Sequence, residues 1–199
     1  MDRRNFIQHL ITVAAVSLLS GRGQAADHKE RKVTQMAISK TTIERFSIVS
    51  NNNFEEVIAC FIAKIGHPLM AEFHKSIAAT QTEDELKAVV ESATGPSELM
   101  EFARFDIGGV LRKENAAALK SQRFIAGNPL IMKQLVKAVP DAASYAPVSI
   151  LIDERQDGVH LSYDRMASLL FPYKNPEATK VAKDLDKKVE ALLLACAGW

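Results

Sequence analysis

Apolar residues recur with helical spacing in several stretches of the chain. The clearest stretch runs from residue 54 to 65, where one face of a helix is apolar. Asn53 precedes this stretch and Glu56 stands three residues later, which is the capping-box pattern of a helix start. The pattern predicts a helix that begins after Asn53 and ends at Pro68. Its apolar positions are Phe54, Val57, Ile58, Phe61, Ile62 and Ile65.

Four more stretches are predicted to be helical. They are residues 69–78, the segment after the Thr82 and Glu85 capping box, residues 130–139, and residues 176–197. Asn128-Pro129 places a capping residue before a proline at the first helical position, so a helix starts there and stops at Pro140. The last helix has an apolar stripe formed by Val181, Leu185, Val189, Leu192 and Cys196.

Strand-like segments alternate with these helices. They are residues 41–49, 98–107, 123–126, 148–154 and 159–164. Gly108-Gly109 ends the second strand segment or introduces a bulge in it. Asp157-Gly158 predicts a type I′ hairpin between the last two strand segments. Interspersed strands and helices with a tight hairpin favour an α+β domain, with an antiparallel sheet backed by helices, over residues 41–199.

The N-terminus has the layout of a bacterial export signal. Arg3-Arg4 precedes a polar residue, a Phe and an Ile, which resembles the twin-arginine motif. An uncharged apolar stretch follows from residue 10 to 19, and Gly23-Gln24-Ala25 offers small residues for cleavage. We expect a signal peptide over residues 1–25, read by the twin-arginine machinery and signal peptidase, and a periplasmic product. An ordinary secretory signal with an incidental arginine pair is the alternative.

Charge and hydropathy indicate what kind of protein remains after the signal peptide is removed. The chain has 199 residues with 25 Lys and Arg against 24 Asp and Glu, and removing residues 1–25 leaves 22 against 23. This balance gives no basic excess for nucleic acid, which needs several clustered phosphate contacts. After residue 25 no apolar run approaches the roughly 20 residues of a membrane span. We expect a flexible arm over residues 26–40 and a soluble domain, and the sequence leaves a homodimer open.

The two cysteines are far apart in the sequence. Cys60 and Cys196 form neither a CxxC motif nor a metal-ligand spacing. Each lies on a predicted amphipathic helix, at or beside its apolar stripe. We therefore expect two small buried side chains without a bond between them, and a disulfide formed in an oxidising periplasm is the alternative.

Four short motifs resemble one protein family. They are Phe102-Ala103-Arg104-Phe105-Asp106, Gly127-Asn128-Pro129 with Leu130 and Met132, Ala146-Pro147 before residues 148–154, and Asp157-Gly158 before Ser162-Tyr163-Asp164. In this order they resemble the bacterial and archaeal family catalogued as domain of unknown function 302. The resemblance covers roughly residues 40–175. It implies a TATA-binding-protein-like α+β fold, a curved antiparallel sheet with helices packed on one face, and it implies no activity.

The sequence departs from this family pattern at two places. Many members have a His after the Asp, where Ile107 stands here, and a Leu before the Pro, where Ala146 stands here. Similarity of fold to a DNA-binding protein is not evidence of DNA binding.

The predicted hairpin gathers polar side chains on one face. Pairing across an Asp157-Gly158 loop puts Ile150, Ile152, Leu161 and Tyr163 on one face and polar residues on the other. That second face holds Asp153, Arg155, His160, Ser162 and Asp164. Asp153, His160 and Ser162 are candidate catalytic residues, because carboxylate, imidazole and hydroxyl groups support proton transfer and nucleophilic attack. The solvated face of a sheet has the same pattern, and neither a GxSxG nor an HExxH motif is present.

A second candidate ligand-binding set lies on the strand over residues 98–107. Alternation places Met100, Phe102, Arg104 and Asp106 on one face. Arg104 and Asp106 could then line a cavity together with Asn128. A cross-strand ion pair and a helix cap are the alternative interpretation of the same residues.

Metal or haem binding is a third hypothesis. Cleavage after residue 25 would create the N-terminus Ala26-Asp27-His28, whose amine, amides and imidazole offer four coplanar nitrogens. Such a set suits Cu(II) or Ni(II), with His28 and the Ala26 amine as ligands. No CxxCH haem motif is present, so the scattered methionines are expected to fill the core.

These observations rank three functions. The leading hypothesis is a non-catalytic periplasmic domain that binds a small ligand or a protein through the polar sheet face. The alternative is a periplasmic hydrolase that uses the same face, and the third is a metal or haem carrier.

Overall fold

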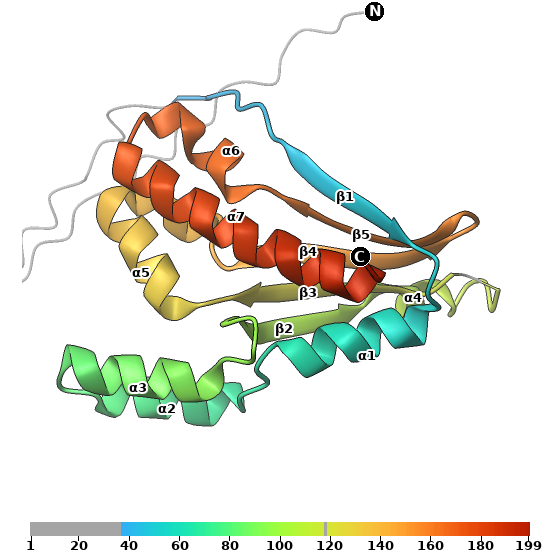
Figure 1. The fold of residues 1–199 in the computed structure, drawn as a ribbon, viewed down its shortest axis with the longest axis horizontal. Helices are drawn as coiled ribbons and strands as arrows, with labels where there is room; N and C mark the ends of the chain where they lie inside the picture. Colours follow the sequence, from blue (N-terminus) through green and yellow to red (C-terminus); the bar gives the residue numbers. More distant parts are fainter. Residues whose placement is uncertain (1–36, 118) are drawn as a thin grey trace, which may run out of the picture. The chain divides into compact units, whose positions relative to one another are not determined.

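A five-stranded antiparallel sheet is the centre of the fold, as predicted. The computed structural model describes residues 37–117 and 119–199, and residues 39–199 form one unit. The strands lie in the order β1-β5-β4-β3-β2 (Figure 1). Their bounds are β1 Arg45–Ser50, β2 Met100–Asp106, β3 Ser121–Gly127, β4 Val148–Arg155 and β5 Gly158–Asp164. The predicted signal peptide and most of the predicted arm lie outside the described residues.

Seven α-helices and two 3₁₀ turns lie between the strands or after the last one within the described residues. The α-helices are α1 Phe54–Lys64, α2 Met70–Ala79, α3 Glu83–Ala93, α4 Ile107–Leu111, α5 Pro129–Ala138, α6 Met166–Leu170 and α7 Pro176–Ala197. The 3₁₀ turns are η1 Pro140–Ser144 and η2 Phe171–Tyr173. Both predicted capping boxes are present: Asn53 with Glu56 begins α1, and Thr82 with Glu85 begins α3. Asn128 and Pro129 begin α5 as expected.

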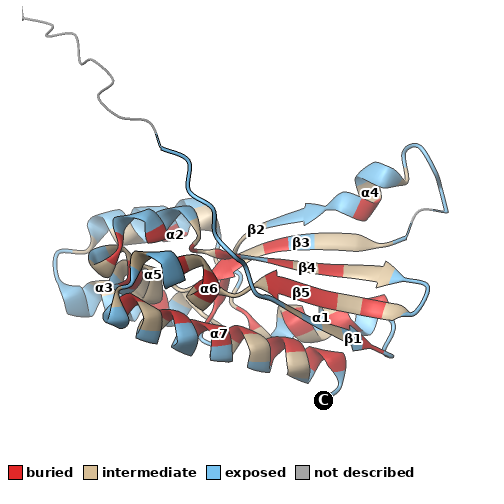
Figure 2. Ribbon diagram, turned by 90° about the horizontal axis from the view of Figure 1, so that it is seen from above, coloured by how far each residue is buried: buried red, intermediate tan, exposed pale blue. Residues whose placement is uncertain are grey.

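Helices α1 and α7 cover one face of the sheet. Both figures place them on the same side of the strands (Figures 1 and 2). The buried core lies between these helices and the inward positions of the strands, where Phe124, Ile150 and Leu161 are fully buried. The opposite face has no long helix in the part of the chain that the structure describes. The side chains on that face are therefore not covered by α1 or α7.

A disulfide joins the two covering helices, so the expectation of unpaired cysteines was wrong. Cys60 in α1 and Cys196 in α7 are bonded, with 5.4 Å between their Cα atoms. Each cysteine lies on the inner side of its own helix, and the contact between α1 and α7 brings the two sulfurs together. Packing of two helices that are distant in sequence cannot be seen in the periodicity of either.

The hairpin between β4 and β5 forms with a different register from the predicted one. Asp153 pairs with His160 and Arg155 with Gly158, so the turn consists of Gln156 and Asp157. Neither turn residue has a positive φ, so the turn is not type I′; Gly158 has φ +135° instead. The register differs from the prediction by two residues, and a shift of two keeps every side chain on its predicted face.

Strand β2 departs from simple alternation. Its pairing with β3 shifts between Glu101 and Ala103, which is a bulge, so Met100, Phe102, Arg104 and Asp106 do not share one face. The Gly108-Gly109 pair lies inside the short helix α4 rather than ending a strand in a loop. Asp106 caps this helix by accepting a hydrogen bond from the Gly109 amide at 2.7 Å.

A buried carboxylate ties α7 to the segment after β5. Asp186 is fully buried and accepts hydrogen bonds from the Met166 amide at 2.8 Å, the Ala167 amide at 3.1 Å and the Tyr163 hydroxyl at 3.1 Å. These amides begin α6, whose own N-cap side chain makes no capping bond. Burial raises the pKa of Asp186 above its ordinary value, and the two amide hydrogen bonds partly offset that rise. The residue has a structural role that the sequence analysis missed.

Candidate functional site

The face of the sheet away from α1 and α7 presents rows of side chains. The strand registers place one residue from each strand in a single row across the sheet. The row consists of Phe105, Arg123, Leu151, Ser162 and Ser47. Neighbouring strands lie about 4.8 Å apart, so adjacent members of this row are within reach of each other. A ligand on this face therefore meets several strands at once.

A groove of about 490 Å³ crosses this face. Its floor is made by β1, β5, β4 and β3, and residues from η1, the following loop and α6 form a wall at one end. Tyr145, Pro147 and Leu169 are the apolar wall residues. The polar lining residues are Arg45, Arg123, Ser144, Ser149, Ser162 and Asp164. The groove thus combines an apolar side with two guanidinium groups and three serine hydroxyls.

Arg123 is the cation of the groove that the described residues leave without a counter-charge. Its Nε donates a hydrogen bond to Ser149 Oγ at 2.7 Å, and its side chain is exposed. Among the described residues no carboxylate lies within ion-pair distance of it. A guanidinium has five N–H donors, so most of Arg123's donors remain for a ligand. Guanidinium groups bind carboxylate and phosphate in a two-point geometry.

Arg45 is neutralised by its neighbour across the strands. Its Nε and Nη2 donate to the two carboxylate oxygens of Asp164 at 2.7 and 3.0 Å. Hydrogen bonding to Asp164, and then its negative charge, raise the pKa of Arg45 above its ordinary value. This pair borders the groove and adds no net charge. Arg123 is therefore the group that sets the electrostatic preference of the groove.

The three candidate catalytic residues, Asp153, His160 and Ser162, are not hydrogen-bonded to one another in the structure. Asp153 and His160 are cross-strand partners, but both carboxylate oxygens of Asp153 accept hydrogen bonds from Arg155, at 2.6 and 3.2 Å. His160 Nε2 lies 2.8 Å from Asp157 Oδ1, and this contact lowers the pKa of Asp157. Ser162 is two residues further along β5, roughly 7 Å away. Only Ser162 and Asp164 of the polar hairpin set line the groove.

The second predicted set is spread along the β2–β3 ladder. Asn128 caps α5 through the Leu130 amide and donates to the Glu98 carbonyl at 2.9 Å. Asp106 lies at the other end of β2, where it caps α4 and faces Arg112 at 3.4 Å. Arg104 binds Glu101 at 2.6 Å and lies over the Phe124 ring. The structure does not bring these three residues together around one cavity.

Sequence reasoning missed Arg45, Arg123, Tyr145 and Ser149. Arg123 is followed by the buried Phe124 and, two residues later, the buried Ala126, so alternation along this short strand places Arg123 on the outer face, and this pattern was available in the sequence. The pattern did not reveal that β3 lies beside β4 and that β1 lies beside β5. The groove is built by this strand order, so its residues come from four separate segments.

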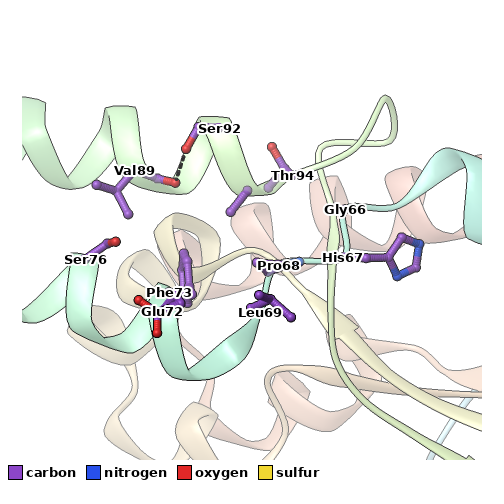
Figure 3. A pocket seen from close by; sticks show the side chains of 11 residues that line it. Gly66, His67, Pro68, Leu69, Glu72, Phe73, Ser76, Val89, Ser92 and Thr94 are labelled. Carbon is purple, nitrogen blue, oxygen red and sulfur yellow. Dashed lines mark hydrogen bonds between the residues drawn. The ribbon is translucent and has the colours of Figure 1, made fainter.

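A second cleft lies between α2 and α3 (Figure 3). It has a volume of about 350 Å³, and Phe73 and Val89 form apolar walls. Two of its polar groups have internal partners: Ser92 Oγ donates to the Val89 carbonyl at 2.9 Å, and Glu72 binds Lys75 at 2.8 Å. His67 points away from the cleft in Figure 3 and contacts the Ile62 carbonyl. This cleft offers a ligand fewer directed groups than the groove.

Metal binding receives no support from residues 37–117 and 119–199. Within them no group of three or more His, Cys, Asp or Glu side chains could hold a metal ion. His28 and Ala26, the predicted Cu(II) or Ni(II) ligands, lie outside the described residues. No helix in the described part of the chain is long and apolar enough to cross a bilayer.

Comparison with known proteins agrees with the resemblance noted in the sequence. The family model described as domain of unknown function DUF302 matches residues 75–196. The chain belongs to the DUF302 family. The match includes the β4–β5 hairpin and the last three strands, which together build most of the groove floor. A comparison with curated proteins gave no significant match.

A solved DUF302 structure has the same fold. The crystal structure of an uncharacterized conserved DUF302 protein from Bacillus stearothermophilus matches with a TM-score of 0.53 and 11% sequence identity. The similarity covers 76% of this chain and 97% of that chain. The predicted α+β architecture, an antiparallel sheet with helices packed on one face, is therefore confirmed. An identity of 11% supports the fold alone, so the function must be argued from the groove.

Proposed function

We propose that this DUF302 protein is a non-catalytic, exported binding domain whose groove takes a small organic ligand with an anionic group. The observation behind the proposal is Arg123, a guanidinium in a groove of mixed polarity with only Ser149 Oγ as its partner among the described residues. Ligand sites in proteins combine apolar walls with a few directed polar groups. Arg123 would bind the anionic group, and Tyr145 and Leu169 would contact the apolar part.

Binding fits this groove better than hydrolysis does. A nucleophile needs a base within hydrogen-bond reach, and His160 is held by Asp157 rather than by Ser162. Ser162 is the most buried of the three groove serines, at 9% exposure, which suits a group that accepts or donates one hydrogen bond to a ligand. The alternative hypothesis of a hydrolase would require a ligand-induced rearrangement of this hairpin.

Export to the periplasm is part of the proposal. Disulfides persist in oxidising compartments, and the Cys60–Cys196 bond is in accord with that location. Replacing Arg3 and Arg4 by Lys should leave the precursor in the cytoplasm, because the twin-arginine receptor requires the guanidinium pair. Export of the Lys-Lys variant at the normal level would rule out the twin-arginine route.

Native mass spectrometry tests the binding function. Wild-type protein purified gently from cells should retain a small adduct, and the released compound should ionise in negative mode. Arg123→Gln should lose the adduct, because it removes the charge and leaves a shorter, uncharged polar side chain. Arg155→Gln is the matched control: it is an exposed arginine on the same face, outside the groove. An adduct retained equally by all three proteins would contradict the assignment to Arg123.

A further inference from the structure

Helix α7 begins beside a second, separate cationic surface. A shallow groove of about 710 Å³ is lined by the exposed ring of Phe171, by Asn175, and by residues of α7 between Pro176 and Lys187. Four lysines line it: Lys174, Lys180, Lys183 and Lys187. We call these four residues the lysine strip. Positions 180, 183 and 187 follow helical spacing, so they lie along one face of α7.

Few acidic side chains neutralise the positive charge of the lysine strip. Lys187 pairs with Asp184 at 3.1 Å, and Asp184 is the only acidic lining residue. Among the described residues no carboxylate lies within ion-pair distance of Lys174, Lys180 or Lys183. The clustering is not a consequence of a basic domain, because residues 39–199 contain 19 Lys and Arg against 21 Asp and Glu. A weakly acidic domain thus has one face with a local positive charge.

The phenyl ring of Phe171 adds an apolar contact to this charge. Its side chain is 75% exposed at the start of η2, although a protein of this size can bury such a ring. Lysines beside an exposed aromatic residue are typical of surfaces that bind anionic membranes. Protein–protein interfaces, in contrast, are depleted in lysine and enriched in arginine. The composition of this surface therefore favours a lipid surface over a protein partner.

We infer that the lysine strip and Phe171 dock the domain onto an anionic phospholipid bilayer. The lysine ammonium groups would lie at the lipid phosphates, and the Phe171 ring would enter the interfacial region. The apolar face of α7 stays in the core, where Leu185, Val189 and Leu192 are buried, so contact is peripheral. The groove on the sheet face is lined by other residues, so the two surfaces share no side chain.

Vesicle co-sedimentation tests this inference. The protein is purified in the processed form that accumulates in cells and mixed with vesicles of phosphatidylglycerol and phosphatidylcholine, or of phosphatidylcholine alone. We expect binding to the anionic vesicles only, and release at high salt. Each lysine near an anionic surface contributes roughly fivefold to partitioning. Lys180→Glu with Lys183→Glu should therefore reduce binding at least about 25-fold, and Phe171→Ala several-fold.

Matched variants elsewhere on the surface provide the control. Lys75→Glu with Lys87→Glu reverses two exposed charges on α2 and α3, and Leu69→Ala removes an exposed apolar side chain. These variants should bind like the wild type. Equal binding to both vesicle types, or an equal loss in the control reversal, would overturn the inference. Binding to soluble polyglutamate without binding to vesicles would also overturn it and would assign the strip to an acidic peptide.

Discussion

Reduction of the Cys60–Cys196 disulfide should strongly destabilise the domain. The bond closes a loop in which the two cysteines are 136 residues apart. In the chain-entropy model, a closed loop of this length stabilises the folded state by about 5 kcal/mol relative to the unfolded chain. Measured values are usually lower than this limit, so we expect reduction to cost about 3–5 kcal/mol. This loss would be a large part of the 5–15 kcal/mol that is typical of a folded domain.

Guanidinium chloride unfolding of oxidised and reduced protein measures this difference directly. Reduction should lower the midpoint, because the unfolded chain gains conformational freedom. The double variant Cys60→Ala, Cys196→Ala provides the control, since its stability should be the same with and without reductant. The reasoning would be refuted if oxidised and reduced wild type differed by less than about 0.5 kcal/mol, or if the untreated, unfolded protein contained two free thiols.

Three further predictions concern single residues. Burial raises the pKa of Asp186 above its ordinary value of 3.8, so the folded state binds this proton more tightly than the unfolded state. Its contribution to the free energy of unfolding therefore falls as the pH rises above about 3.8. The free energy of unfolding of the wild type minus that of Asp186→Asn should therefore decrease as the pH rises above about 3.8. A difference that does not change with pH would contradict a raised pKa for Asp186. Gly158→Ala should lower the free energy of unfolding by about 1–3 kcal/mol, because φ is +135° and a Cβ would lie 2.7 Å from the Ser50 carbonyl oxygen. Chemical denaturation measures this loss. An equal loss for Gln156→Ala, in the adjoining turn, would argue against backbone strain at Gly158. Asn53→Ala should lower stability by about 1 kcal/mol through loss of the α1 cap, whereas Asn52→Ala, next to it, should have little effect; equal melting temperatures for the two variants would refute the capping role.

Local signals in the sequence predicted the elements well. The capping boxes at Asn53 and Thr82 and the Asn128-Pro129 helix start depend on contacts within four residues, so they are visible in the chain itself. The inward and outward faces of β4 and β5 were also correct, although the register was not. Strand faces repeat every two residues, so the two-residue error did not change them.

Features that depend on distant packing could not be predicted in the same way. The groove needs β1 beside β5 and β3 beside β4, and this order brings Arg45 and Arg123 to one surface. The disulfide needs α1 against α7. Asp186 stands between Ala182 and Val189 within the apolar stripe of α7, a position that indicates a buried carboxylate. Its partners at the start of α6 become apparent only in the folded structure.

The most direct test of the proposed function is an NMR titration of the groove. The probes are benzoate and phenyl phosphate, each with an anionic group on an aromatic ring, and benzamide serves as the neutral control. The proposal predicts saturable shifts at the Arg123 Nε–H and at the Ser149 and Tyr145 amides with the anions, weak shifts with benzamide, and loss of these shifts in Arg123→Gln. Shifts centred on the α2–α3 cleft, or equal shifts with benzamide and benzoate, would contradict the proposal.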